Sequence, residues 1–447
     1  MVKAHTLKEI VRLQKRNIPV GITSICSANK MVLEAVMIRA LTLNNDVLIE
    51  ATANQVNQFG GYTGMKPIDF TEFVYGIAER IGFPKNKLIL AGDHLGPLTW
   101  VDLPEDEAMA NAETLVYDFV KAGFTKIHLD TSMKLSTDPV VGILSTEVIA
   151  DRGARLALKC KQAFEEYLKM NPDAMSPVYV IGSEVPIPGG AQEEEEDLQV
   201  TKVTDLIETI DLFKAAFSKY ELKDIWEDVI AVVVQPGVEF GDDTIHEYNR
   251  EAAKDLVKAI EQYPNLVFEG HSTDYQTPQK LRELVEDGVA ILKVGPAVTF
   301  ALREGLFALA RIEDEITIGE EGIRSNLIDV IEDVMLESPK NWKKHYHGSE
   351  SEMKLARTYS FADRVRFYIG SDKVQRAIDL MFENLSNQPI SFSLLSQYAP
   401  IQYHKIRKGI LNNNAYDIAL DAVINVVDEY NYAIFPDTLV GIKHHLA

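Results

Sequence analysis

Cysteine is scarce in this sequence, which contains only Cys26 and Cys160. Two cysteines cannot form the disulfide framework of a small extracellular domain, and their scarcity agrees with a reducing compartment. No apolar run reaches the roughly 18 residues of a membrane-spanning helix. The first residues, MVKAHTLKEIVRLQKRN, are amphipathic and lack the apolar stretch of a signal peptide. We therefore expect a cytoplasmic protein.

Basic residues are outnumbered, since 45 lysines and arginines face 67 aspartates and glutamates, for a net charge of −22. Nucleic acids and anionic membranes bind basic surfaces, so we expect neither as a partner. A small phosphorylated substrate stays open, because one site can be locally basic or hold a metal ion. The sequence also lacks a GxGxxG motif after its first apolar run, so a dinucleotide-binding fold has no support.

Short apolar runs alternate with amphipathic stretches over the first 315 residues. Such alternation predicts a parallel sheet with helical crossovers. Eight units of this kind close into a (β/α)8 TIM barrel, with an open doubly wound sheet as the structural alternative. The expected strands are 18–26, 46–51, 87–94, 125–131, 178–184, 229–235, 266–271 and 289–295. The clearest expected helices are 31–43, 69–81, 108–122, 154–170, 203–217, 248–262 and 298–312.

The strand pattern stops near residue 315. We therefore expect a TIM barrel over residues 1–315 and a helical C-terminal extension over residues 316–447, which covers part of the barrel or mediates assembly. The helices expected in the extension are 321–336, 359–367, 373–385 and 417–431. The acidic run at 193–197 is expected to be a solvated loop.

Polar side chains stand near the ends of most expected strands. Strand alternation puts His128 with Asp130 on one face, and Glu269 with His271 on one face. Barrel interiors are normally filled by Val, Ile and Leu, and an unpaired buried charge costs several kcal/mol, so this polar set indicates a ligand site. Its members are Ser24, Glu50, Asp93, His94, Asp130, Glu184, Gln235, His271 and Lys293.

Some polar residues of the strands fit a purely structural role as well as a functional one. His128 and Glu269 favour hydrogen-bonded core positions, and Glu50 either pairs with Lys293 or faces a substrate. The Asp-His pair in AGDHLGP and His271 in GHSTD favour function. Imidazoles on two strands with carboxylates between them predict a divalent metal site, with Zn²⁺ the first choice and Mn²⁺, Co²⁺ or Ni²⁺ as alternatives.

Loop residues complete the expected site. The amide- and glycine-rich loop at 54–64 suits sugar hydroxyls, with an ordinary surface loop as the alternative. Gly295-Pro296 precedes a helix whose N-terminus is a place for a phosphate. The residues expected to contact substrate are Ser24, Glu50, Asn54, Asn57, Gln58, Ser132, Ser272, Asp274 and Gly295.

Several segments resemble a known family. They are 54–65, GDHLGP at 92–97, IHLDTS at 127–132, GSEVPIPGG at 182–190, VVQPGVEF at 233–240, HSTDYQT at 271–277, LKVGPAVTFALRE at 292–304 and SQYAP at 396–400. These motifs look like the Z-type subunit of class II D-tagatose-1,6-bisphosphate aldolase. Known members of that family are described as non-catalytic subunits that support a catalytic aldolase chain. Other relatives are described as stand-alone, metal-dependent epimerases that interconvert fructose and tagatose, or their 6-phosphates, at C4.

The resemblance also implies residue roles. The Asp-His pair of the more distant catalytic class II aldolases matches Asp93 as proton-transfer group and His94 as metal ligand, and their late-strand histidine matches His271. Their remaining histidine is matched here by Gln235, an unusual candidate ligand, with Glu184 or Asp130 as the alternatives for the third ligand.

Three hypotheses follow. The first is metal-dependent cleavage and re-formation of the C3–C4 bond of a ketohexose or its phosphate, giving net 4-epimerisation by this chain alone. In it Asp93, Asp130 or Glu184 serves as base, and Lys293 stabilises negative charge. The second is an accessory subunit of a catalytic aldolase partner, with homo-oligomerisation also open. The third is an aldolase that forms a Schiff base at Lys293.

Overall fold

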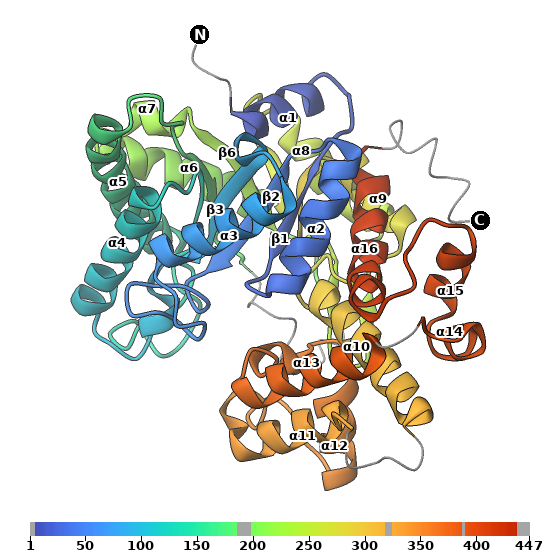
Figure 1. Ribbon diagram of the computed structural model, residues 1–447. Helices are drawn as coiled ribbons and strands as arrows, with labels where there is room; N and C mark the ends of the chain where they lie inside the picture. Colours follow the sequence, from blue (N-terminus) through green and yellow to red (C-terminus); the bar gives the residue numbers. More distant parts are fainter. Residues whose placement is uncertain (1–4, 186–197, 318–323, 387–388, 436–447) are drawn as a thin grey trace.

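The computed structural model describes residues 5–185, 198–317, 324–386 and 389–435. Eight parallel strands close into a barrel in the order β1-β10-β9-β6-β5-β4-β3-β2, ringed by helices (Figure 1). The expected (β/α)8 fold is therefore confirmed. The barrel strands are β1 Ile22–Cys26, β2 Val47–Thr52, β3 Leu88–Leu95, β4 Lys126–Leu129, β5 Val178–Ile181, β6 Val229–Val234, β9 Val267–Gly270 and β10 Val289–Val294.

Helices follow the strands and pack on the outside of the barrel. A small antiparallel hairpin, β7 Glu239–Phe240 with β8 Ile245–His246, follows β6. The helices up to the end of the barrel are α1 Thr6–Gln14, α2 Lys30–Leu43, α3 Pro67–Ile81, α4 Glu105–Lys121, α5 Thr146–Met170, α6 Val203–Lys219, α7 Lys223–Trp226, α8 Arg250–Ile260, α9 Pro278–Glu286 and α10 Pro296–Ile316.

Helix α1 seals the N-terminal end of the barrel. Its apolar side chains Leu7, Ile10 and Val11 are buried against the first interior layer, which includes Leu48 and Ile291. That layer is aliphatic, as is usual for TIM barrels. Because one end is closed by apolar contacts, a polar ligand reaches the interior from the opposite end, where the strands finish.

The chain after α10 wraps back onto the barrel. Its helices are α11 Leu327–Glu337, α12 Glu350–Tyr359, α13 Asp372–Ser386, α14 Phe392–Tyr398, α15 Pro400–Arg407 and α16 Ala415–Ile434. Helix α16 packs against α2, α9 and α10, and Asp428 on it accepts two hydrogen bonds from Arg39 of α2, at 2.6 and 2.9 Å. Helices α11, α12 and α13 gather at the end of the molecule opposite α1 (Figure 1).

Sequence and structure differ in detail. The helix expected at 359–367 is wrong, because α12 ends at Tyr359 and only a short 3-10 turn, Arg364–Phe367, follows. The helices that were not expected are α1, α7, α9, α12, α14 and α15. The acidic run at 193–197 lies outside the described residues, and the division at residue 315 stays a prediction. Among the described residues, no helix is both long and apolar enough to cross a membrane.

We expect Leu7→Ala to lower the free energy of unfolding by about 2–5 kcal/mol, because Leu7 is fully packed where α1 closes the barrel. Urea denaturation followed by circular dichroism measures this. Leu41→Ala, at an exposed leucine of α2, is the matched control and should change stability by about 0.5 kcal/mol or less. Equal effects of the two substitutions would mean that α1 does not act as a seal.

Candidate active site

A cavity of about 130 Å³ lies at the C-terminal ends of the strands. Its wall combines the strand ends with the loop after β2 and with the 3-10 turn of the C-terminal extension. The lining residues are Cys26, Thr52, Asn54, Gln55, Tyr62, Asp93, His94, Phe240, His271, Ser272, Asp274, Lys293, Val294, Gly295, Pro296, Arg366 and Phe367. Arg366 and Phe367 show that the extension helps to enclose the cavity.

Asp93 and His94 are neighbours in β3, yet both face the cavity. Regular strand alternation would send them to opposite sides. His94 instead adopts a φ of 47°, in the left-handed region that non-glycine residues rarely occupy, and this turns its ring inward. Gly96 permits the sharp path that follows, because a Cβ there would lie 1.6 Å from the carbonyl oxygen of Asp130.

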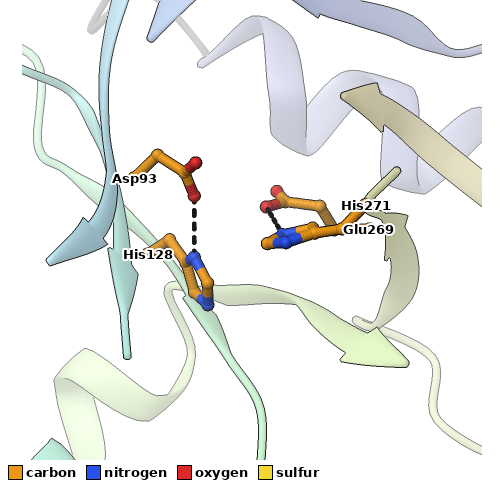
Figure 2. Close-up of side chains that lie close together, drawn as sticks. All are labelled: Asp93, His128, Glu269 and His271. Atoms are coloured by element: carbon orange, nitrogen blue, oxygen red, sulfur yellow. Dashed lines mark hydrogen bonds and ion pairs between the residues drawn. The ribbon is translucent and has the colours of Figure 1, made fainter. Parts of the chain in front are cut away.

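Four buried side chains meet beneath the cavity: Asp93, His128, Glu269 and His271 (Figure 2). One nitrogen or oxygen of each lies within 4.8 Å of those of the others, as in a metal site. Asp93 Oδ1 lies 2.9 Å from His128 Nδ1, and Glu269 Oε1 lies 3.0 Å from His271 Nε2. Two ligands of one Zn²⁺ ion are separated by about 3.0–3.5 Å, given bond lengths near 2.1 Å.

The surroundings of His128 fit a cation. Its Nδ1 lies 2.9 Å from Asp93 Oδ1 and 3.2 Å from the backbone nitrogen of His94. A ring nitrogen has one in-plane position, so Nδ1 either donates a proton to the carboxylate or accepts one from the N–H group; when Nδ1 carries the proton, Nε2 carries the free lone pair. The other nitrogen, Nε2, is buried with no hydrogen-bond partner among the residues that the structure describes.

His94 is oriented by a second carboxylate. Asp130 Oδ2 lies 2.7 Å from its Nδ1, and Asp130 Oδ1 accepts from Ser132 Oγ at 2.7 Å. Such a carboxylate contact fixes the tautomer of a ligating histidine. The imidazole centroid of His94 lies 5.0 Å from that of His271 and 5.2 Å from that of His128. The ring of His94 therefore packs against the cluster without being one of its four members.

A layer of buried charges supports the cluster. Lys126 is fully buried and forms ion pairs with Glu50 and with Glu269, the latter at 2.7 Å. Lys293 pairs with Asp93 and lies 3.5 Å from Glu50. Leaving the imidazoles out of the count, the four carboxylates of this layer, counting Asp130, outnumber its two ammonium groups by two. A divalent cation would neutralise that excess, which is costly to bury uncompensated.

The protonation states follow from these contacts. Burial by itself raises the pKa of Asp93, but His94 and Lys293 outweigh it and hold the pKa well below its usual range. Burial, helped by Lys293, lowers the pKa of His271 well below its ordinary value, so this imidazole is neutral and able to ligate.

Lys293 is charged rather than nucleophilic. Burial lowers its pKa, but the carboxylates of Asp93 and Glu50 more than reverse this and raise the pKa above its ordinary value. A protonated amine cannot attack a carbonyl, so these contacts argue against Schiff-base formation at Lys293.

Several expected site residues do not reach the cluster. Gln235 Oε1 accepts from the backbone N–H groups of Gly237 and Val238 at 2.8 and 2.9 Å, which turns it away as a ligand. Glu184 is exposed and accepts a hydrogen bond from Thr201 at 2.6 Å. Neither lies in the cluster of candidate ligands, whereas His128 and Glu269, for which the sequence favoured a core role, do.

The expected substrate contacts divide in the same way. Asn57 builds a turn, since its Oδ1 accepts from the N–H groups of Phe59 and Gly61, and Gln58 Nε2 donates to the carbonyl of Asn111. Ser132 binds Asp130, Glu50 pairs with lysines, and the Oγ of Ser24 is buried in the barrel. Asn54, Ser272, Asp274 and Gly295 do line the cavity.

Sequence reasoning missed Lys126 and Arg366. Lys126 is the first residue of β4 and lies two residues before His128, so strand alternation puts both side chains on the same face of the strand. Arg366 reaches the cavity through a contact between the extension and the barrel, which no local pattern reveals.

Comparison with known proteins identifies the family of this chain. The family model for "D-tagatose-1,6-bisphosphate aldolase subunit GatZ/KbaZ-like" matches residues 7–435. The chain belongs to this family. The resemblance seen in the sequence motifs is therefore confirmed.

Solved structures include a chain of high similarity. A crystal structure of a probable tagatose 6 phosphate kinase from Sinorhizobium meliloti 1021 is 45% identical, with a TM-score of 0.83, and the match covers 92% of this chain and 100% of that one. A putative fructose-1,6-biphosphate aldolase from Coccidioides immitis is 15% identical, with a TM-score of 0.42, and the match covers 86% of this chain and 98% of that one. The likeness to the Coccidioides protein is too weak to say anything about the chemistry of this chain.

We expect His128→Ala and His271→Ala each to lower the amount of Zn²⁺ retained after loading and dialysis, because each removes an imidazole from the buried cluster. His94→Ala should lower it as well, because the ring of His94 packs against both of those imidazoles. Metal analysis by mass spectrometry measures the content, and circular dichroism checks the fold. Gln235→Ala is the control and should retain Zn²⁺, since its amide serves the loop. Full retention in all three histidine variants would contradict the site.

Proposed function

We propose that this chain is a divalent-metal-dependent enzyme that cleaves and re-forms the C3–C4 bond of a ketohexose or its phosphate, with net 4-epimerisation between the fructose and tagatose configurations. The observation that carries the proposal is the metal-ready cluster at the base of a cavity that also exposes Asp93 and Lys293. Membership of an aldolase-subunit family supports C3–C4 chemistry on a tagatose-type sugar.

The reaction needs a base, a charge stabiliser and a dry enclosure. A bound divalent ion would act as a Lewis acid on the C2 carbonyl. The base removes the C4 hydroxyl proton, the C3–C4 bond breaks, and its electron pair forms a three-carbon enediolate beside a three-carbon aldehyde. If the aldehyde turns its other face before the bond re-forms, and the proton returns to the C4 oxygen, the product is the 4-epimer.

Asp93 is the proposed base. It is ionised because of its low pKa, it lines the cavity, and it belongs to a cluster that the substrate must approach. The ammonium group of Lys293 is the proposed stabiliser of negative charge on the enediolate. Asp130 acts indirectly, by holding the ring of His94. The exposed Glu184 has no part in this scheme.

A second candidate, an accessory subunit of a catalytic aldolase, is favoured by one exposed loop. Between β4 and α5, the side chains of Val140, Val141 and Ile143 are 94%, 88% and 96% exposed. The base of the loop is anchored, because Asp138 receives two hydrogen bonds from Arg152 at 2.7 and 2.9 Å. An apolar tip on a fixed base suits insertion into a partner protein.

We expect the purified chain alone, loaded with Zn²⁺, Mn²⁺, Co²⁺ or Ni²⁺, to convert D-fructose or D-fructose 6-phosphate into the tagatose counterpart. EDTA should stop the reaction, because the ion is needed at C2. Product analysis by chromatography measures it. The accessory role gains support instead if the metal-loaded chain makes no 4-epimer but prolongs the activity of a catalytic aldolase subunit, and if Val141→Ser with Ile143→Ser abolishes that effect.

We expect Asp93→Asn to lower kcat by about 10²-fold or more, the usual scale for a lost general base. The amide keeps the shape of the side chain, so Zn²⁺ content and the melting temperature serve as checks on the site. Glu184→Gln is the matched control and should keep normal turnover, because this carboxylate is exposed and outside the cluster. Normal turnover in Asp93→Asn would move the base elsewhere.

A further inference from the structure

Asp274 closes the N-terminus of α10 from inside the cavity. Its Oδ1 accepts hydrogen bonds from the backbone N–H groups of Gly295 at 3.0 Å and Ala297 at 2.8 Å. The intervening Pro296 has no N–H to offer. The side chain is 3% exposed and shares the cavity wall with His271 and Lys293. A carboxylate of the chain itself therefore occupies the first free donors of a 21-residue helix.

This position is the one where TIM barrels frequently hold a phosphate, between the loops after the seventh and eighth strands at a helix N-terminus. Here β9 and β10 are those strands, Asp274 follows the first, and Gly295 follows the second. A phosphate at α10 would have to displace the carboxylate from its two donors or lie beside it. The second arrangement brings like charges together where little water screens them.

The charge on Asp274 persists near neutrality. Burial raises the pKa of its carboxyl group to about 6, against the stabilising effect of the two backbone N–H groups, so the group is mainly ionised at pH 7. Arg366 lines the same cavity, and its guanidinium donates to the backbone carbonyl of Asp363 at 3.0 Å. A carboxylate and a guanidinium together carry no net charge. Such a pair suits a hydroxyl group, which donates a hydrogen bond to the carboxylate and accepts one from the guanidinium.

We propose that Asp274 is a specificity residue that excludes a phosphate from the α10 end of the cavity and binds a free hydroxyl there. For the ketose of the proposed function, on which this assignment of ends rests, the excluded phosphate is the one on C1. C1 is bonded to C2, whose carbonyl has to reach the cluster that includes His271, three residues before Asp274. The site then takes a ketohexose or its 6-phosphate, and rejects 1-phosphates and 1,6-bisphosphates.

The test compares wild type with Asp274→Ser, which frees the two backbone donors, and with Asp274→Asn, which keeps the shape and removes the charge. Isothermal titration with inorganic phosphate, in the Zn²⁺-loaded protein, is the first measurement. We expect Asp274→Ser to bind phosphate at least about tenfold more tightly than wild type, because a buried like charge is gone. Asp274→Asn should show a smaller gain in phosphate affinity, since the amide oxygen of Asn still accepts from the N–H groups of Gly295 and Ala297.

The second measurement compares turnover of D-fructose 6-phosphate and D-fructose 1,6-bisphosphate. Wild type should have the higher kcat/KM for the monophosphate. In Asp274→Ser the ratio of kcat/KM for the monophosphate to kcat/KM for the bisphosphate should fall toward one. Equal use of both substrates by wild type, or no gain in phosphate affinity in either folded variant, would overturn the proposal. If no ketose is converted by any variant, the proposed function fails, while the phosphate titration still decides the role of Asp274. Should Asp274→Ser not fold, Asp274→Asn alone decides it.

Discussion

The burial of charge inside the barrel is the constraint on which the rest of this structure depends. Lys126, Glu50 and Glu269 are all inaccessible to solvent, and a lone charge at such a depth would cost several kcal/mol. Lys126 bridges the two glutamates, while Lys293 pairs with Asp93 one layer nearer the cavity. The remaining negative excess faces the imidazoles. The same arrangement that lowers the cost of burying these charges therefore leaves a cluster with the composition of a divalent-cation site.

That constraint explains the asymmetry of the barrel. At the N-terminal end, aliphatic side chains and α1 exclude water, so the charges above them act in a medium of low polarity. At the other end, the 3-10 turn with Arg366 and Phe367 leans over the cavity from the C-terminal extension. The extension is tied to the barrel through α16. It therefore contributes to the site as well as to the fold. The sequence pattern, which changes near residue 315, gives no sign of that contribution.

Much of the fold and part of the site could be predicted from sequence, because strand alternation has a fixed period. It placed His128 with Asp130, and Glu269 with His271, on one face of their strands. The glycines around the Asp-His pair pointed to an unusual backbone there. Strand alternation failed where a loop decides the direction of a side chain. Gln235 turns into its own loop, since backbone N–H groups two and three residues later need an acceptor. Arg366 depends on a contact between distant segments, which periodicity cannot encode.

The cavity and the apolar loop at Val140 and Val141 lie on the same end of the barrel, because every loop that follows a strand emerges there. A partner seated on that loop would therefore stand beside the mouth of the cavity. A catalytic and an accessory role then need not be built on separate surfaces. One chain can keep its own metal-ready cluster and still present a docking element next to it, so the presence of the cluster does not argue against a partner. What separates the roles is whether this chain's own residues enclose the substrate well enough to exclude water, and Arg366 and Phe367 at the cavity wall favour enclosure by the chain itself.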